Sequence, residues 1–465
     1  MNDFERNYWS SYCDFIDLFA PLTYLGISIP LVSPYYVLIH ENAINKLSDK
    51  ALSKSIKTSI KKERDIQSHF EQRLNSYRKK VSQSKGKVVL YDTSLRIPEL
   101  MLKEHFLPSE TMILRQRSKN PKPPHAIPAA PFISYSKVNK KTISEFQTKA
   151  IECLNKVNFH PIYGDKKFRN RLVKIIPGIM HQISAAVHFF EKTSVSCLVL
   201  GTTNSSDTRS MALAASLKGV PTICLQHGIP MLEFGYLPKV ADYLAVYGSY
   251  DVEWYSNKGV PLTSLKSMGH PRFDEIFKMN VMDKKAFQTH FKLDPSKKTV
   301  LLVIHHEETE IPKAIIQQMK GTCNLIVKQR NGKQRDSEKT VLLQKEFPDV
   351  SFADDMHLYN LLHCVDAVIS YESTIVLEAM LADKPVFIWK LRSLVPSSTN
   401  YYEQLNDYIF QDAGTLVKSV TAALEADFDK QTWERKKTEF LASKYFAQTA
   451  TSIHQLKALI QSLKA

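Results

Sequence analysis

Short apolar runs alternate with helical patterns along most of the chain. Runs of three to six residues rich in aliphatic side chains predict buried strands, because they are too short for helices. The predicted strands are Val88–Tyr91, Thr111–Leu114, Val195–Leu200, Val220–Leu225, Val300–Ile304, Leu325–Lys328, Val350–Phe352, Ala367–Ser370 and Pro385–Trp389. Helical patterns fall between them, for example at Ile179–Phe190 and Ser206–Leu217. Two successive strand–helix–strand series predict an α/β protein with two doubly wound parallel sheets.

The same pattern divides the chain into three segments. Residues 1–86 form an apolar and basic helical extension, residues 87–282 a first α/β domain, and residues 283–465 a second one with terminal helices. Five prolines between Pro121 and Pro131 predict an irregular loop rather than a strand, available for contact with a substrate.

The stretch Leu18–Ile39 carries no charged side chain and is long enough to span a membrane. Pro21, Pro30 and Pro34 would each break or kink a helix there. We therefore expect buried or interfacial loops and short helices rather than a transmembrane segment.

Basic residues are concentrated between Lys46 and Lys87, where 13 basic and 4 acidic side chains give +9 of the formal +15 charge. Apolar residues recur there at helical spacing: Leu52, Ile56, Ile60, Ile66, Phe70, Leu74, Tyr77 and Val81. An apolar stripe flanked by lysines suits an anionic membrane surface, where each basic residue contributes about 1 kcal/mol. The alternative is a surface helix that packs on its own domain.

The composition is that of a globular protein. Of the 465 residues, 43% are hydrophobic and 23% charged, which excludes wholesale disorder and a fibrous chain. The six cysteines contain no CxxC pair, which favours reduced thiols over disulfides or a zinc site. Acidic and aromatic residues follow Met1, so we expect no signal peptide and a cytoplasmic protein, with the basic segment directed to the inner face of the plasma membrane.

The motif Leu225–Pro230, Leu-Gln-His-Gly-Ile-Pro, follows a predicted strand. Ligands of doubly wound sheets bind at the carboxyl ends of the strands. Gly228 permits a tight turn close to a ligand, and His227 has the chemistry of a general base near neutral pH. A purely structural histidine is the alternative.

A second motif, Gly-His-Pro-Arg-Phe-Asp, spans 269–274. Arg272 offers a planar fork for phosphate or carboxylate, and Asp274 could orient it. The alternative is a turn in which the two side chains form a salt bridge.

A third motif lies in the second sheet, where a strand ends at Ser370 and a helix begins around Ser373. Free N–H groups and the positive end of the dipole make such a helix start a phosphate site, and the hydroxyls of Ser373 and Thr374 can also donate. Glu378, just over one turn later, would reach ribose hydroxyls. As structure alone, Ser373 is an N-cap and Glu378 a surface residue.

The order His-Gly, then Gly-x-Pro-Arg-x-Asp, then a serine-rich turn before Lys384-Pro385-Val386 resembles GT-B transferases, in which two Rossmann-type domains face a cleft. It is most similar to the CDP-glycerol glycerophosphotransferase family, which includes teichoic-acid polymerases, and to related capsule-polysaccharide glycosyltransferases. The likeness covers roughly Val195 to Trp389.

The resemblance implies a catalytic role for His227, and matches Arg272, Asp274 and Ser373 to the family's Pro-Arg-x-Asp motif and phosphate-binding serine. The family's second histidine, in an Arg/Lys-x-His-Pro stretch, is replaced by Val327-Lys328-Gln329-Arg330-Asn331. Its Asp-Tyr-Ser-Ser turn is Ser-Tyr-Glu-Ser here. The pieces at Glu378 and Lys384 look more like sugar-nucleotide glycosyltransferases.

These features together predict an inverting transferase that moves a sugar or glycerophosphate from a CDP-, CMP- or UDP-linked donor to a surface polysaccharide or teichoic-acid-like acceptor. His227 takes the proton of the acceptor hydroxyl, with His305 and His306 as alternative bases. The predicted donor-binding residues are Arg272, Asp274, Lys328, Arg330, Ser370, Ser373, Thr374 and Glu378, and the predicted acceptor-binding residues are Asp207, Arg209, Gln226 and Gly228. No Asp-x-Asp pair suggests a metal site, so neither a metal nor another cofactor is expected.

Two other classes of protein remain open at this point. A sugar-nucleotide 2-epimerase would use the same architecture without an acceptor. A nucleic-acid-binding protein is suggested by the isoelectric point near 9.3, but its basic residues should spread over one docking face rather than concentrate in one segment.

Overall fold

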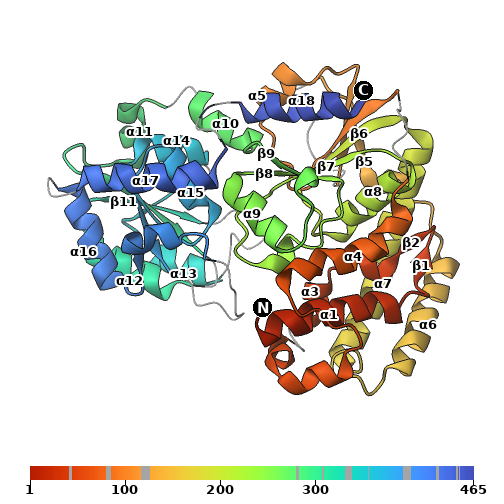
Figure 1. Ribbon diagram of the computed structural model, residues 1–465. Helices are drawn as coiled ribbons and strands as arrows, with labels where there is room; N and C mark the ends of the chain where they lie inside the picture. Colours follow the sequence, from red (N-terminus) through yellow and green to blue (C-terminus); the bar gives the residue numbers. More distant parts are fainter. Residues whose placement is uncertain are drawn as a thin grey trace. The chain divides into compact units, whose positions relative to one another are not determined.

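The computed structural model describes residues 1–40, 44–79, 85–116, 126–278, 282–305, 308–329, 338–353, 356–390, 400–425, 429–446, 449 and 451–464. The chain forms two compact units (Figure 1). Unit 1 comprises Met1–Pro271 and Thr451–Ala465, and unit 2 comprises Arg272–Ala450.

Unit 1 is built on a seven-stranded sheet in which every pairing is parallel. The strand order is β5-β4-β3-β6-β7-β8-β9, so the chain starts in the middle, moves to one edge and then returns to build the other side. The strands are β3 (Lys87–Tyr91), β4 (Thr111–Arg115), β5 (Ala129–Pro131), β6 (Val195–Leu200), β7 (Thr222–Leu225), β8 (Tyr243–Val246) and β9 (Leu265–Ser267). The direction reverses between β3 and β6, which is where such sheets bind ligands.

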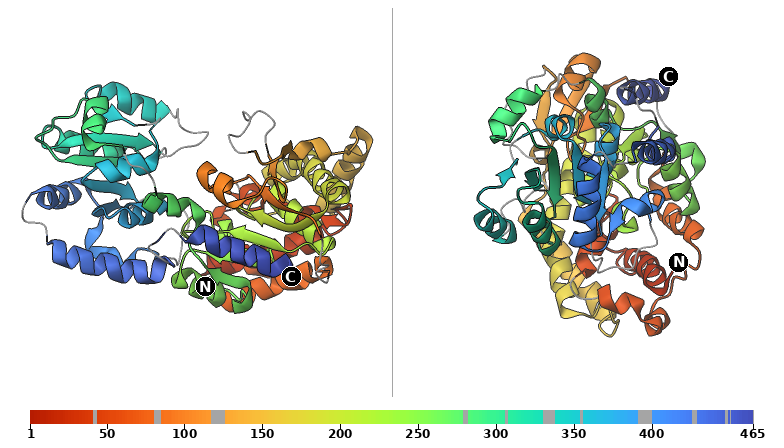
Figure 2. Two further views of the ribbon diagram at one scale, coloured as in Figure 1. Left: turned by 90° about the horizontal axis from the view of Figure 1, so that it is seen from above. Right: turned by 90° about the vertical axis from the view of Figure 1, so that its left-hand side faces the viewer.

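Unit 2 repeats this plan in a six-stranded parallel sheet of order β12-β11-β10-β13-β14-β15. Its strands are β10 (Thr299–Ile304), β11 (Asn324–Gln329), β12 (Ser351–Phe352), β13 (Ala367–Tyr371), β14 (Val386–Trp389) and β15 (Ile409–Phe410). The switch point lies between β10 and β13. Helices cover both faces of this sheet (Figure 2). The predicted α/β class with two doubly wound parallel sheets is confirmed.

The other helices of the two units have the following bounds. Unit 1 contains α4 (Ile66–Leu74), α5 (Glu99–His105), α6 (Lys140–Lys156), α7 (Lys166–Lys192), α8 (Ser206–Leu217), α9 (Ser249–Asn257) and α18 (Ser452–Lys464). Unit 2 contains α11 (Lys284–Phe291), α12 (Glu310–Met319), α13 (Glu338–Glu346), α14 (Leu358–Cys364), α15 (Thr374–Leu381), α16 (Ala413–Leu424) and α17 (Lys430–Lys444), and α10 (Pro271–Lys278) begins at the boundary.

All nine predicted strands exist, with ends shifted by at most two residues. The prediction of an irregular proline-rich loop is wrong at its end, because Ala129–Pro131 forms the edge strand β5. An edge strand tolerates Pro131, whose missing N–H is not needed there. The prolines Pro121, Pro123 and Pro124 lie outside the described residues.

The units divide the chain differently from the predicted segments. Residues 1–79 belong to unit 1 rather than forming a separate extension, and the boundary falls at Pro271 instead of 282. Helix α18 returns to unit 1, where Ile453, Leu456 and Ile460 join the apolar core beneath β3 and β6.

The N-terminal residues form short elements that pack on unit 1. These are α1 (Asp3–Leu18), β1 (Thr23–Tyr24), β2 (Ile27–Ser28), α2 (Ile29–Val32), α3 (Tyr35–Ile39), and the 3₁₀ helices η1 (Ile44–Ser48), η2 (Lys50–Ser55), η3 (Glu63–Asp65) and η4 (Asn75–Tyr77). The interpretation of Leu18–Ile39 as buried short helices and loops is confirmed, since its apolar residues from Leu22 to Ile39 are largely buried.

The expectation of an amphipathic helix with an apolar face open to a membrane is wrong. Leu52, Ile60, Ile66, Phe70, Leu74 and Tyr77 are all at most 8% exposed. The described members of the stripe lie in η2, α4, η4 and the segment after η2 rather than in one helix, and these six residues pack inside unit 1. Val81 lies outside the described residues. The described lysines that flank the stripe remain on the surface.

One buried guanidinium ties the N-terminal residues to the sheet. Arg209 of α8 is 2% exposed, and its Nε donates to the carbonyl oxygen of Thr203 at 2.7 Å. Its Nη1 donates to the hydroxyl of Tyr12 and to the carbonyl oxygens of Leu31 (3.4 Å) and Ser33 (3.2 Å). A cation that is fully buried must be satisfied in this way, so Arg209 holds three segments of unit 1 together.

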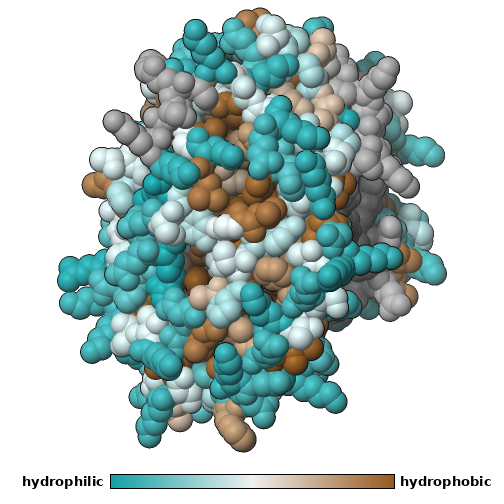
Figure 3. Space-filling model, turned by 90° about the vertical axis from the view of Figure 1, so that its right-hand side faces the viewer, coloured by the Kyte–Doolittle hydropathy of each residue, from teal (hydrophilic) through white to brown (hydrophobic). Residues whose placement is uncertain are grey.

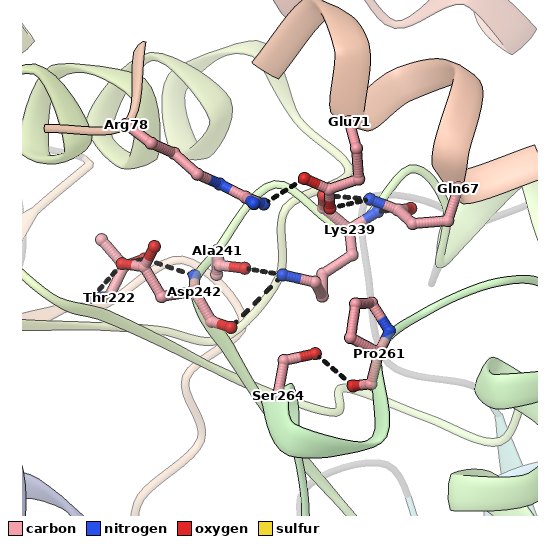
Figure 4. A network of polar contacts seen from close by, with 9 residues as sticks. All are labelled: Gln67, Glu71, Arg78, Thr222, Lys239, Ala241, Asp242, Pro261 and Ser264. Atoms are coloured by element: carbon pink, nitrogen blue, oxygen red, sulfur yellow. Dashed lines mark hydrogen bonds and ion pairs between the residues drawn. The ribbon is translucent and has the colours of Figure 1, made fainter. Parts of the chain in front are cut away.

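The side chain of Gln67 joins α4 to the loop before β8, which carries a second buried cation, Lys239 (Figure 4). The side chain of Gln67 pairs with the backbone of Lys239, accepting from its N–H at 2.8 Å and donating to its carbonyl oxygen at 2.9 Å. Lys239 Nζ donates to the carbonyl oxygens of Ala241 (2.8 Å) and Asp242 (3.3 Å). Burial lowers the pKa of Lys239 to about 8.

Helix α7 has a proline in its interior, Pro177, which cannot donate to the carbonyl oxygen of Val173. Gln147 of α6 supplies the missing donor at 3.3 Å. Among the described residues α7 is also the one helix whose length and composition would allow it to cross a membrane, but half of its apolar window is buried in the protein.

On the face drawn in Figure 3, apolar side chains appear in patches between hydrophilic ones.

We predict that Arg209→Ala lowers the free energy of unfolding of unit 1 by about 3 kcal/mol, since each hydrogen bond to a charged group contributes about 1.5–3 kcal/mol. The carbonyl oxygens of Leu31 and Ser33 would keep only their contacts with the Tyr12 hydroxyl, at 3.5 and 3.4 Å. Urea denaturation measures the change. Lys218→Ala, at the exposed end of the same helix, is the control and should shift the value by less than about 0.5 kcal/mol. Equal effects of the two substitutions would show that Arg209 does not anchor the N-terminal residues.

Candidate functional site

The carboxyl end of β3 meets that of β6 at the switch point of unit 1. Gly201 follows β6, and a Cβ at this position would lie 2.2 Å from the carbonyl carbon of Ser94 in the loop after β3. Only glycine allows the two backbones to approach this closely. The loop itself is strained, because Ser94 (φ +56°) and Arg96 (φ +53°) adopt left-handed conformations.

Asp207, a predicted acceptor residue, lies buried beside this switch point in the first turn of α8. Its Oδ2 accepts hydrogen bonds from Tyr91 Oη (2.7 Å), Thr93 Oγ1 (3.2 Å) and Gln116 Nε2 (2.9 Å). The carboxylate therefore joins the ends of β3 and β4 to α8. Its neighbour Arg209 is the buried anchor described above, so binding of an acceptor by either side chain stays a prediction that this packing does not favour.

The His227 turn, residues 226–229, follows β7. Gln226 is 4% exposed, and its Nε2 donates to the carbonyl oxygen of Gly228 and to Oδ1 of Asp251, both at 2.9 Å. Gln226 thus shapes the turn from within rather than facing a ligand. Gly228 contributes the carbonyl that Gln226 holds.

His227 is half-buried and stacks on Tyr236, with ring centroids 4.7 Å apart and an interplanar angle of 8°. Tyr236 is fixed in turn, since its hydroxyl donates to the carbonyl oxygen of Ile229 at 2.7 Å. A small pocket opens here, lined by His227, Tyr236 and nine further residues: Thr202, Thr203, Cys224, Leu225, Gln226, Gly235, Leu244, Val246 and Tyr255. The stack fixes the plane of the imidazole beside this pocket.

Charges buried behind the turn hold the loop that carries Tyr236. Glu233, just before it, forms an ion pair with Lys258 and accepts from Trp9 Nε1 at 3.0 Å. Lys258 also reaches Glu63 at 3.0 Å. Burial raises the pKa of Glu233, and the Lys258 ammonium opposes that effect. The N-terminal residues thereby position the ring on which His227 stacks.

In unit 2 the switch point brings the ends of β10 and β13 together. His305, directly after β10, contacts Tyr371 at the end of β13 with ring centroids 5.0 Å apart and the rings nearly perpendicular. His305 therefore lies at the carboxyl ends of the strands, beside the switch point where doubly wound sheets bind ligands. His306 lies outside the described residues.

Helix α15 begins immediately beyond this crevice. Ser373 is its N-cap and makes no side-chain capping bond within the helix, and its Oγ lies 3.5 Å from that of Ser370. The hydroxyl of Tyr402 donates to the carbonyl oxygen of Ser373 at 2.6 Å and so fixes the turn. Thr374 is the first helical residue. The structure therefore brings Ser370, Ser373 and Thr374 together at a helix start, as predicted.

Glu378 is not the surface residue that the structural interpretation predicts, because it is 7% exposed. Tyr359 of α14 donates to its Oε1 at 3.1 Å. Burial raises the pKa of Tyr359, and the Glu378 carboxylate adds to the effect while nearby Arg272 opposes it. Arg272 lies with its guanidinium carbon 4.3 Å from the centroid of the Phe273 ring. These buried side chains cluster where α10, α14 and α15 meet.

The remaining predicted donor residues have different positions. Lys328 is 4% exposed and its Nζ donates to the carbonyl oxygens of Ala353 (3.0 Å) and Met356 (3.1 Å), so it braces the loop after β12. Asp274 is fully buried in the first turn of α10. Arg330 lies outside the described residues. Donor binding by these three residues stays a prediction.

Two charged residues near these sites were missed by sequence reasoning. Glu372 lies in the turn between β13 and α15, where burial raises its pKa against the opposing charge of Lys390. The exposed Arg96 donates from Nη1 to the carbonyl oxygen of His227 at 3.3 Å. The sequence could have indicated Glu372, because it is the glutamate of the Ser-Tyr-Glu-Ser turn. Nothing in the sequence connects Arg96 with His227, because 131 residues separate them.

No group of three His, Cys, Asp or Glu side chains within the described ranges could hold a metal ion. Hydroxyls and backbone N–H groups instead dominate the start of α15. The six cysteines are free and buried.

Comparison with solved structures identifies the architecture. The chain is similar to the wall teichoic acid polymerase TagF, in a structure soaked with CDPG, with a TM-score of 0.50 and 13% identity over 85% of this chain and 94% of that chain. It has the GT-B fold. The predicted resemblance to GT-B transferases of this kind is therefore confirmed at the level of the fold.

Two further solved structures match with TM-scores of 0.49 and 13% identity. They are HepE from Anabaena in complex with UDP and glucose, covering 81% of this chain and 99% of HepE, and a UDP-N-acetylglucosamine 2-epimerase, covering 83% and 96%. No family model and no curated protein sequence matches the chain.

We predict that Glu372→Gln stabilises unit 2 at neutral pH. Because the folded state raises the pKa of this carboxyl, its ionisation costs stability above the folded pKa, and the cost disappears as the pH falls through that value. The gain in the urea midpoint at pH 7 should therefore shrink toward about pH 4. The matched control is Glu403→Gln, at an exposed carboxyl of the same unit. A loss of stability at pH 7, or a gain independent of pH, would contradict this account of Glu372.

Proposed function

We propose that the protein is an inverting GT-B transferase that uses a nucleotide-activated donor. The observation that carries the proposal is the start of α15 beside the switch point of a Rossmann-type sheet, where the hydroxyl oxygens of Ser370 and Ser373 lie 3.5 Å apart and Thr374 is the first helical residue. Aligned N–H dipoles at a helix start stabilise phosphate oxygens, and the serine and threonine hydroxyls add further hydrogen-bond donors.

In this proposal unit 2 binds the donor. The helix start takes the phosphates, His305 contacts them from the end of β10, and Glu378 accepts hydrogen bonds from the ribose. Arg272 adds positive charge close to Glu378. A preorganised dipole and cation can stabilise the charge that develops on the leaving phosphate without a metal ion.

Unit 1 supplies the base and the acceptor site. His227 is half-buried, and Tyr236 holds its ring in a fixed plane. A neutral imidazole in this position takes the proton from the attacking acceptor hydroxyl as the new bond to the donor forms and the nucleotide leaves. The transferred group is a sugar or glycerophosphate from a CDP-, CMP- or UDP-linked donor, and the acceptor is a polysaccharide or teichoic-acid-like polymer.

Peripheral binding to an anionic membrane is a further part of the proposal. The apolar stripe is buried, so this binding would depend on the exposed basic residues. Seven basic residues between Lys46 and Arg64 are exposed: Lys46, Lys50, Lys54, Lys57, Lys61, Lys62 and Arg64. Lys46 Nζ contacts the carbonyl oxygen of Pro161 at 3.0 Å, which brings the loop of Phe159 close to these cations. Phe159 is 98% exposed and is an apolar anchor of the kind that inserts into a headgroup layer.

Ser373→Ala and His227→Ala should have separable effects. Ser373 interacts with the donor in the ground and transition states alike, so its loss should weaken donor binding by about 1.5–3 kcal/mol and raise the donor KM. The thermal shift, that is, the rise in melting temperature that CDP or UDP produces, should become smaller. His227 acts while the proton moves, so its loss should leave that shift intact and lower kcat about 10²–10⁴-fold.

The same transfer assay also tests His305 and His306 as alternative bases and an isomerase as the alternative activity. His305→Ala and His306→Ala should keep more activity than His227→Ala. Normal turnover by His227→Ala together with an inactive His305 or His306 variant would place the base in unit 2. Conversion of the nucleotide sugar in the absence of any acceptor would instead indicate an isomerase.

Charge reversal of Lys50, Lys54 and Lys57 to Glu should release the protein from vesicles that contain phosphatidylserine, because each lysine contributes about 1 kcal/mol near an anionic surface. Co-sedimentation at low salt measures binding. Reversal of Lys140, Lys141 and Lys149, exposed on α6, is the control with the same change in net charge and should have a smaller effect. Equal release by both triple variants would remove the assignment to this surface.

A further inference from the structure

The pocket beside His227 lies at the carboxyl ends of neighbouring strands of unit 1. Thr202 follows β6, Leu225 ends β7 and Leu244 belongs to β8. Helix α9, which begins after β8, contributes Tyr255. The strands supply aliphatic side chains to this wall, so its few polar groups decide what the pocket can bind.

Tyr255 brings a buried phenol to this pocket, with 3% of its surface exposed. Burial raises the pKa of Tyr255 well above its usual range, and the ionisable groups of Tyr236 and Cys224 add to the effect. Both neighbours also line the pocket, which places the Tyr255 hydroxyl on the pocket side of α9. Among the described residues this hydroxyl has no hydrogen-bond partner, because the bonds at Tyr255 are those that its carbonyl oxygen accepts from Lys258 and Val260.

Three other polar side chains of the pocket are engaged within the protein. Thr202 Oγ1 accepts the backbone N–H two residues later at 3.1 Å. Gln226 Nε2 and Tyr236 Oη donate to backbone carbonyl oxygens at 2.9 and 2.7 Å. Tyr255 differs from these three, and a buried hydroxyl without a partner lowers stability. Such a group is explained where a bound molecule completes its hydrogen bonding.

We propose that this pocket binds a second hydroxyl group of the acceptor and that Tyr255 is the residue that recognises it. A phenol hydroxyl can both donate to an alcohol and accept from it. A site built to hydrogen-bond a substrate hydroxyl discriminates against an analogue that lacks it. The pocket therefore selects acceptors with a hydroxyl next to the attacking one, as in the vicinal diols of sugars and polyols. This inference rests on the proposed function of His227 as the base.

Tyr255→Phe is the decisive variant, because it removes the hydroxyl and keeps the ring. The assay is the rate at which diethyl pyrocarbonate modifies His227, measured by peptide mass spectrometry without any donor and normalised to the exposed His454. Propane-1,2-diol should protect His227 in the wild type at lower concentrations than propan-1-ol, which lacks the second hydroxyl. In Tyr255→Phe the concentration of the diol that gives half protection should rise about 2–10-fold, as expected for one lost hydrogen bond.

Tyr243→Phe, in β8 but outside the pocket lining, is the matched control and should be protected as the wild type is. The urea midpoint of Tyr255→Phe should equal or exceed that of the wild type, because the hydroxyl has no partner to lose. A lower midpoint would mean that the hydroxyl supports the fold instead, and this would overturn its role in recognition.

The site would also be overturned if the diol protected Tyr255→Phe and the wild type equally, or if the diol and propan-1-ol protected the wild type equally or not at all. Because no transfer is measured, failure of the donor-binding experiments does not affect this result. Normal turnover by His227→Ala would refute the base, whereas loss of the preference for the diol would refute the role of Tyr255, so the two failures are distinguishable.

Discussion

The burial of the Arg209 guanidinium is the constraint on which the organisation of unit 1 depends. A cation that is shielded from solvent needs hydrogen-bond acceptors within the protein. Arg209 finds them in Thr203 after β6 and in three N-terminal residues, Tyr12, Leu31 and Ser33. The first 79 residues are consequently part of the sheet's support rather than an appendage. The Trp9–Glu233–Lys258 contacts extend this support to the ring behind His227.

In the proposed function, the two units use the same sheet topology for different chemistry. At the switch point of unit 2, a helix start rich in hydroxyls suits a group that is already negatively charged. On unit 1, the proposal assigns to the imidazole of His227, which is stacked on Tyr236, a nucleophile that must lose a proton. If that proposal holds, donor binding and proton transfer depend on separate parts of the chain, and substitutions in one unit will alter one step without abolishing the other.

The sequence predicted the strands and the serine turn well, because both depend on local patterns. Apolar runs identify central parallel strands, and the spacing of Ser370, Ser373 and Thr374 around a strand end indicates a helix start. Within the two parallel sheets, β5, β9 and β15 lack such a run and were not predicted. The internal strand β8 was also missed, although Tyr243–Val246 is itself a four-residue apolar run. Arg209, Gln226 and Lys328 have the residue types of ligand-binding groups, but partners distant in sequence turn them into internal supports.

The return of α18 to unit 1 has a consequence for how the protein is made. Its apolar residues fill the core beneath β3 and β6, yet they leave the ribosome only after all of unit 2 has been synthesised. Unit 2 is contiguous and can acquire its structure during translation, whereas unit 1 must wait with an open core. A nascent chain of this design exposes apolar surface longest in its earliest part, and chaperones would be needed most at that stage.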